Sequence, residues 1–166
     1  MIKCRHHLIC DVHSKALRHL QLKTLFDRTE LSQDDLSKYI FWDPSLPYSR
    51  NRIATDDKHY ELLVLCWNPK RESRIHNHPG DGCYVKIISG SVRETVYDVS
   101  DNAAPAFRSE SILQPASVCY MDDSLGLHRL GNPSKSEGAI TLHLYTPPVA
   151  RCKVYYICYT YNYLLI

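Results

Sequence analysis

Five short runs of β-forming residues between residues 60 and 145 constrain the fold of this chain more than any other feature. Turn-forming residues such as Gly, Pro, Asn, Asp and Ser separate the runs. The runs cover residues 60–67, 83–88, 91–98, 117–121 and 140–145. Ser89-Gly90 predicts a tight hairpin between the second and third runs, and residues 79–82 predict another turn. Short strands with this spacing are typical of an antiparallel barrel or sandwich, so we predict a mainly β fold.

The first forty residues hold the expected helices. Apolar residues recur at three- and four-residue spacings over residues 15–26, and residues 32–40 begin with Ser and two nearby Asp residues. We therefore predict two short N-terminal helices. No linker or repeat divides the chain, and 166 residues that are 44% hydrophobic are enough for one core. We expect a single domain over residues 1–166, with a helical part at 1–45, a barrel at 46–152 and a tail at 153–166.

Charge and composition exclude several classes of function. The net charge of +2 is spread without long runs of one sign, so we expect no nucleic-acid partner. The most apolar run, the last 13 residues, is too short to span a bilayer, and the first ten residues lack a signal pattern, so we expect no membrane partner. The seven cysteines include no CxxC pair, which indicates free thiols in a reducing compartment, with Cys66 and Cys119 in the core. We expect a soluble, cytoplasmic protein.

A pair of histidines in Ile75-His76-Asn77-His78-Pro79 gives the first indication of chemistry. In an extended strand, side chains two residues apart leave the same face and stand roughly 7 Å apart, so both imidazoles can reach one metal ion. Neutral imidazole binds Fe, Zn, Cu and Ni, so the pair predicts a metal and leaves its identity open. Two solvated histidines beside a Pro-Gly turn are the alternative.

His128 is the predicted third ligand. It lies beyond an expected strand, at the edge of a turn, where its side chain could point into the mouth of a barrel. Three neutral imidazoles leave the charge of a divalent metal uncompensated, which favours an incoming anion such as a thiolate. No Glu or Asp follows the histidine pair within the next expected strand, and Cys83 stands where a fourth ligand would be expected.

These segments resemble the cysteine dioxygenases of type I, which are cupin-fold thiol dioxygenases. The general cupin pattern has a Glu after its HxH motif, whereas this family has a Cys, as this chain does at Cys83. The resemblance implies a cupin-type, jelly-roll-like antiparallel β-barrel, with residues 46–152 as its catalytic part. It covers about two-thirds of the chain, through Tyr48-Ser49-Arg50-Asn51, Leu65-Cys66-Trp67, Ile75-His76-Asn77-His78, Cys83, Gly90, Gly126-Leu127-His128-Arg129 and Leu142-His143-Leu144-Tyr145.

The resemblance also implies a metal, a substrate and a reaction. His76, His78 and His128 occupy the positions of the family's three ferrous iron ligands. Arg50 matches the arginine that holds the carboxylate of L-cysteine, for which its planar guanidinium is suited, and Tyr48 matches an aromatic residue near the substrate. The implied reaction is oxygenation of the L-cysteine thiol by O2 to cysteine sulfinic acid, in cysteine catabolism toward taurine and sulfate. We expect L-cysteine and O2 as partners and a monomeric protein.

Three further residues are implied to be catalytic. Cys83 and Tyr145 match a pair that is joined in related enzymes by a thioether between the sulfur and the phenol ring, which would give a protein-derived cofactor. His143, on the same strand face as Tyr145, resembles a family histidine that hydrogen-bonds the phenol. A core Cys, a core Tyr and a satisfied core His are the alternative. Cys152 matches a cysteine near the pocket entrance and has no assigned role, and a cis bond before Pro147 is compatible with the family pattern.

Two departures from the family keep other functions open. The chain is shorter than the family pattern at both ends, and residues 153–166 no longer resemble it, although their β-forming residues predict one more strand. Lys70 stands where the general cupin pattern has Gly. The alternatives are an inactive or truncated cupin-like metal-binding module, a dioxygenase for another small thiol, and a zinc or manganese cupin acting on a sugar or small acid. The missing Glu and the pairing of Cys83 with Tyr145 argue against the last.

Overall fold

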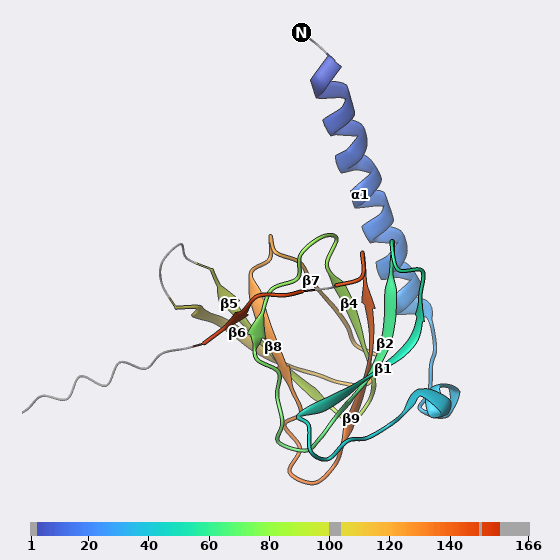
Figure 1. The fold of residues 1–166 in the computed structure, drawn as a ribbon, viewed down its shortest axis with the longest axis vertical. Helices are drawn as coiled ribbons and strands as arrows, with labels where there is room; N and C mark the ends of the chain where they lie inside the picture. The colour runs from blue at the N-terminus through green and yellow to red at the C-terminus, as the bar shows by residue number, and fades with distance from the viewer. Residues whose placement is uncertain (1–2, 100–103, 150, 157–166) are drawn as a thin grey trace, which may run out of the picture.

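The computed structural model (Figure 1) describes residues 3–99, 104–149 and 151–156. Within these ranges the chain forms the helix α1 (Lys3–Arg28), the 3₁₀ helix η1 (Asp34–Tyr39) and ten strands. The strands are β1 (Tyr48–Thr55), β2 (Glu61–Trp67), β3 (Ile75–His76), β4 (Cys83–Ser89), β5 (Val92–Asp98), β6 (Ala106–Leu113), β7 (Val118–Met121), β8 (Leu127–Gly131), β9 (Ala139–Tyr145) and β10 (Val154–Tyr155).

The strands form two five-stranded antiparallel sheets. The first sheet has the order β1-β2-β9-β4-β7, and the second has the order β10-β3-β8-β5-β6. The two sheets curve around a common interior, while α1 packs near its C-terminal end against the first sheet and projects away from the barrel (Figure 1). The predicted mainly β, cupin-type barrel is confirmed.

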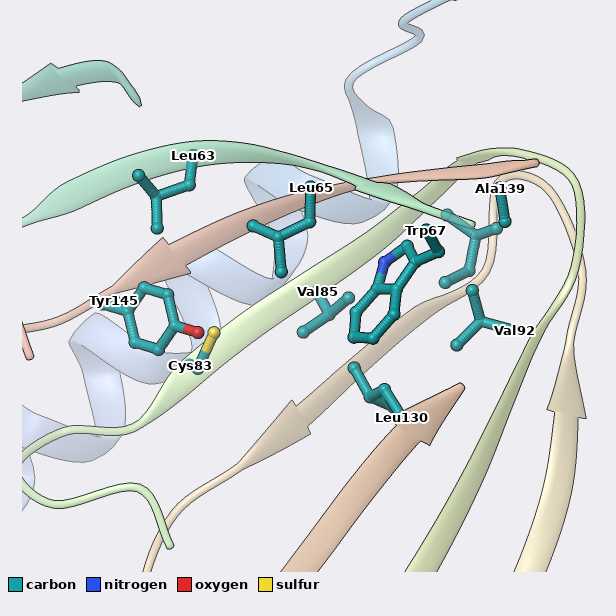
Figure 2. Close-up of a cluster of buried hydrophobic side chains, with 10 residues drawn as sticks. Leu63, Leu65, Trp67, Cys83, Val85, Val92, Leu130, Ala139 and Tyr145 are labelled. Carbon is teal, nitrogen blue, oxygen red and sulfur yellow. The ribbon is translucent and has the colours of Figure 1, made fainter. Parts of the chain in front are cut away.

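The main core lies between the inner faces of the two sheets. Alternate residues of β2 and β4 point inward and meet Val92 of β5 and Leu130 of β8, with Trp67 at the centre (Figure 2). The outer face of the first sheet is covered as well, because Phe26 of α1 and Leu36 of η1 pack on its other alternate residues. This double coverage explains why β2, β4 and β9 are mostly apolar in the sequence, with Lys86, Thr141 and His143 as buried polar exceptions.

Several expected elements differ from the observed ones. The five predicted strands correspond to β2, β4, β5, β7 and β9, and the strand expected in the tail corresponds to β10. The remaining four strands, β1, β3, β6 and β8, were missed. The first helix is 26 residues long, not short, because no Gly or Pro interrupts the chain from Lys3 to Arg28. The second helix is the 3₁₀ segment η1.

The predicted hairpin at Ser89-Gly90 is wrong. β4 pairs with β7 and β9, whereas β5 pairs with β6 and β8, so this turn carries the chain from one sheet to the other. Gly90 has a φ of +70°, and a Cβ at this position would lie 2.8 Å from the carbonyl oxygen of Gly138. The glycine therefore permits both the left-handed backbone and the close approach that the crossing requires.

Three smaller expectations can be compared with the structure. Lys70 has a φ of +58°, which is the left-handed region that favours glycine, in keeping with the Gly of the general cupin pattern. The Thr146–Pro147 peptide bond is cis. The tail supplies one strand, since β10 pairs with β3, while residues 157–166 lie outside the described part of the chain. No helix in the described ranges is long and apolar enough to cross a membrane.

Candidate metal centre

Three histidines converge inside the barrel from the second sheet. His76 ends β3 and is the register partner of His128 on β8, while His78 follows β3 by two residues. One ring nitrogen from each residue lies within 4.8 Å of those of the other two. His128 was predicted in a turn beyond a strand, and this position is wrong because His128 lies within β8. Its predicted place beside the histidine pair is what the structure shows. The spacing of the three donors fits a single metal ion.

The hydrogen bonds of the three rings leave nitrogen lone pairs for a metal. The carbonyl oxygen of Arg74 accepts a 2.8 Å bond from Nδ1 of His76, and a carboxylate oxygen of Glu94 accepts a 2.8 Å bond from Nδ1 of His128. Within the described residues, Nδ1 of His78 and Nε2 of His128 are buried without a hydrogen-bond partner. Buried polar atoms are rarely left unpaired, so these orphaned nitrogens fit a metal-binding role.

Burial keeps the three imidazoles neutral. It lowers the pKa of His76, His128 and His78, and that of His78 falls to about 2, with the neighbouring histidines and Arg50 lowering it further. Neutral imidazole is the form that binds metals. The contact between His128 and Glu94 is accordingly a hydrogen bond from a neutral ring to a carboxylate, not an ion pair between two charged groups.

Asp123 fixes the backbone that carries His78. Its carboxylate accepts bonds from the backbone N–H of His78 at 2.9 Å and from Nδ2 of Asn77 at 3.1 Å, and its own N–H donates to the carbonyl oxygen of His78 at 3.1 Å. These bonds hold His78 in place, although this candidate metal ligand lies outside the strands.

The triad opens into a cavity of about 400 Å³. Arg50 reaches the cavity from β1, and its guanidinium carbon lies 5.4 Å from the ring centroid of Tyr145. Tyr48 lines the cavity from the same strand and packs on Trp67 with ring centroids 4.4 Å apart. The exposed Cys152 also lines it. The cavity therefore combines three neutral metal donors with a fixed positive charge.

Cys83 and Tyr145 lie side by side behind this cavity. They are register partners across β4 and β9, and the sulfur of Cys83 lies beside the phenol oxygen of Tyr145 (Figure 2). Cys83 is fully buried and belongs to the inner core. Burial raises the pKa of the thiol and of the phenol, so both groups remain protonated at neutral pH.

His143 lies between this pair and the centre of the core. Its Nδ1 is 3.7 Å from the sulfur of Cys83, and its Nε2 is 2.8 Å from Oγ1 of Thr141, which also accepts a 2.8 Å bond from the indole N–H of Trp67. The ring of His143 stacks beside that of Tyr145 with centroids 6.1 Å apart, as expected for the same strand face. The hydrogen bond from His143 to the phenol stays a prediction.

All eight residues predicted for the site surround this cavity or the Cys83–Tyr145 pair behind it: Tyr48, Arg50, His76, His78, Cys83, His128, His143 and Tyr145. Sequence reasoning missed Glu94, Asp123 and Thr141, which hold His128, His78 and His143. Glu94 carried a weak signal, because it alternates with Val92 on the inward face of a predicted strand, where a charge is unexpected. Asp123 and Thr141 carried none, because their partners are distant in the sequence.

Comparison with known proteins decides the family. A family model described as cysteine dioxygenase type I matches residues 7–157. The chain belongs to this cysteine dioxygenase family. The match extends through residues 153–157, which the sequence analysis had placed beyond the resemblance. Enzymes of this family are metal-dependent, which agrees with the three-histidine site.

Individual cysteine dioxygenases align over different shares of their length. The chain is 31% identical over 158 residues to cysteine dioxygenase type 1 of Danio rerio, covering 93% of this chain and 77% of that protein. It is 36% identical over 110 residues to the Rattus norvegicus enzyme, covering 65% of this chain and 55% of that protein. The aligned region therefore spans only about half of the mammalian relative.

Solved structures support the fold. A Klebsiella pneumoniae protein with a double-stranded β-helix domain matches with a TM-score of 0.56 and 17% identity, covering 77% of this chain and 91% of that one. A cupin superfamily protein from Desulfitobacterium hafniense matches with a TM-score of 0.52 and 12% identity, covering 73% of this chain and 93% of that one. At these identities the likeness concerns the barrel alone.

Proposed function

We propose that this protein uses ferrous iron to oxygenate the thiol of L-cysteine with O2, giving cysteine sulfinic acid. The observation that carries the proposal is the presence, in one cavity, of three neutral histidine donors and an arginine. Family membership supplies the reaction class. The proposal assigns the metal to His76, His78 and His128, and the substrate carboxylate to Arg50.

The donor set suits a thiol substrate. Three neutral imidazoles leave the full charge of a divalent metal to be balanced by what binds next, and a thiolate is such a ligand. Bound iron would lower the pKa of the substrate thiol and hold it beside O2. Both atoms of O2 are transferred to sulfur, so one thiol and one O2 give one sulfinic acid with no further reductant.

Arg50 would select amino acids with a carboxylate. A guanidinium presents two parallel N–H donors that match the two oxygens of a carboxylate. Arg50 stands beside the ring of Tyr145, which fixes the direction of its planar group. Tyr145 remains protonated because burial raises its pKa, so its hydroxyl can donate a hydrogen bond to an anionic group in the cavity.

A thioether between Cys83 and Tyr145 is part of the proposal. Forming the carbon–sulfur bond removes one hydrogen from the thiol and one from the phenol ring, and O2 takes up the two electrons. Support comes from the register of β4 and β9, which sets the two side chains opposite each other on the inner face. The link would hold the phenol in one orientation at the wall of the cavity.

Oxygen uptake by the iron-loaded protein tests the function. L-cysteine is expected to drive uptake at one O2 per thiol, with cysteine sulfinic acid as the product, while cysteamine and 3-mercaptopropionate are expected to be poorer substrates. A folded protein that binds one iron per chain and shows no thiol-dependent uptake would be a metal-binding module instead. Faster uptake with 3-mercaptopropionate would assign the site to another small thiol.

A further inference from the structure

Glu94 is a buried carboxylate directly behind one of the three histidines. It lies on β5, which pairs with β8 so that Val96 faces His128, and Glu94 is two residues from Val96 on the same strand face. Its Oε1 is 2.8 Å from Nδ1 of His128. Glu94 is 8% exposed and His128 is 1% exposed, so the bond is shielded from water.

The first sheet contributes one further neighbour of this carboxylate. Burial raises the pKa of the Glu94 carboxyl, and the thiol of Cys119 on β7, which faces Glu94, lowers it to a lesser extent. Cys119 is partly buried and packs against the inner core. The hydrogen bond from His128 is thus the contact that fixes where this carboxylate lies.

The bond to Glu94 determines which nitrogen of His128 is left for a metal. A carboxylate accepts hydrogen bonds, so Nδ1 carries the proton and Nε2 carries the lone pair. Nε2 is buried and has no hydrogen-bond partner among the described residues. His76 differs, because its Nδ1 donates to an uncharged backbone carbonyl.

The same contact bears on the charge of the site. The three ligands are neutral, and the carboxylate that the general cupin pattern places among the ligands is replaced here by Cys83. Glu94 is not itself one of the three candidate ligands. It is placed to provide a negative charge behind the ligand His128. A carboxylate behind a ligating imidazole makes that imidazole a better donor.

We propose that Glu94 is a positioning residue for the metal: through His128 it fixes the ring orientation and tautomer of one ligand and strengthens metal binding. The inference rests on the proposed metal site but not on the proposed reaction, so the two can be tested separately.

Metal affinity is the first test. The full chain, stripped of metal, is titrated with Co²⁺ without oxygen, and the visible absorption of the bound ion is followed. Glu94→Gln preserves the volume and removes the charge, and it is expected to weaken binding by about 10- to 100-fold. Glu110→Gln is the matched control, because Glu110 is a carboxylate on β6 outside the cavity, hydrogen-bonded by Thr95. Equal affinities for wild type and Glu94→Gln would overturn the inference.

The second test measures the tautomer of His128. If Glu94 served only the stability of the fold, this tautomer would be the same in the wild type and in Glu94→Gln. In the metal-free wild type, ¹⁵N NMR is expected to show His128 protonated at Nδ1. In Glu94→Gln the side-chain amide can donate to Nδ1, so the population is expected to shift toward protonation at Nε2. A variant that loses stability yet keeps the wild-type tautomer and affinity would show that Glu94 acts only on folding.

The two proposals fail in different ways. Weaker metal binding by Glu94→Gln together with no cysteine oxygenation by the wild type would support the role of Glu94 and overturn the enzyme function. No Co²⁺ or Fe²⁺ binding by the folded wild type would overturn both.

Discussion

Cys83 on β4 and Tyr145 on β9 are direct register partners in an antiparallel pair, with both side chains on the inner face of the barrel (Figure 2). Side chains at such positions have Cβ atoms about 4.5–5.5 Å apart. The contact between thiol and phenol is therefore a consequence of strand register and exists before any covalent bond. The same register sets His143 opposite Val85, so His143 and Tyr145 share this face.

A covalent link between Cys83 and Tyr145 is the first prediction. After incubation with Fe²⁺, L-cysteine and air, peptide mass mapping is expected to find the two peptides joined with the loss of two hydrogens. Cys83→Ser is expected to abolish the joined species. Cys119→Ser is the matched control, because Cys119 is also on the inner face but its register partner is Val85. Linked peptides that involve another cysteine would contradict the assignment.

The second prediction concerns the carboxylate of the substrate. Arg50→Lys is expected to lower kcat/KM for L-cysteine by about 10- to 100-fold. A hydrogen bond to a charged group contributes about 1.5–3 kcal/mol, and an ammonium group cannot present the two parallel N–H donors of a guanidinium to a carboxylate. Turnover of cysteamine, which has no carboxylate, is expected to change little. The measurement is oxygen uptake with both thiols over a range of concentrations.

Arg52→Lys is the control for Arg50. Arg52 is on the same strand but bonds Glu61 at 2.9 Å and does not line the cavity. It is expected to leave the preference between the two thiols unchanged. An equal loss on L-cysteine and cysteamine in Arg50→Lys would assign Arg50 a role other than carboxylate binding.

The fold was predictable where strands are buried on both faces. β2 and β9 are buried over almost every residue, so the sequence itself shows them as apolar runs. β6 is exposed along nearly its whole length and mixes polar and apolar residues, and β3 has only two residues. Neither gives a local pattern. The division of the strands into two sheets could not be predicted either. The glycine turn between β4 and β5 is equally compatible with a hairpin within one sheet and with a connection between two sheets.

The site was predictable where residue type alone carries the chemistry. Histidines two residues apart and a cysteine in place of an acid can be read from a short segment. The contact between Glu94 and His128 cannot be, because 34 residues separate them and only the pairing of β5 with β8 brings them together. The supporting hydrogen bonds of the site depend on tertiary structure, whereas its donors depend on composition and spacing.

The third prediction concerns a buried network that supports His143. Oγ1 of Thr141 bonds both the indole N–H of Trp67 and Nε2 of His143, and Thr141 is fully buried. Thr141→Val keeps the shape and removes the hydroxyl, so it is expected to lower the free energy of unfolding by about 1–3 kcal/mol for each group left unpaired. Thr141→Ser keeps the hydroxyl and is expected to retain most of the stability. Urea unfolding measures both, and a Val variant as stable as the Ser variant would contradict the expectation.

The fourth prediction concerns stability and pH in the metal-free protein. Burial lowers the pKa of His76, His78 and His128 in the folded state, that of His78 to about 2, while imidazoles of the unfolded chain titrate near pH 6.5. Below about pH 6.5 the unfolded state therefore binds more protons than the folded state. The free energy of unfolding is at its full value above that pH and falls as the pH is lowered, by up to about 1.4 kcal/mol per pH unit for each such histidine. The raised pKa of Glu94 opposes this trend just above the usual pKa of a glutamate, because in that range the carboxyl binds a proton more readily in the folded state than in the unfolded state.

Urea unfolding between pH 7 and pH 5, in the presence of a chelator, tests this sign and its source. His78→Gln removes one histidine with a strongly lowered pKa and is expected to reduce the slope of stability against pH by up to about 1.4 kcal/mol per unit, the full value being approached near pH 5. His59→Gln is the control, because His59 is an exposed histidine in the loop between β1 and β2 that bonds Asp56. If His78→Gln kept the wild-type slope, the loss of stability at acidic pH would have to come from groups outside the metal site. If the slope fell in His78→Gln alone, the neutral state of the buried imidazoles would be established independently of any metal or substrate.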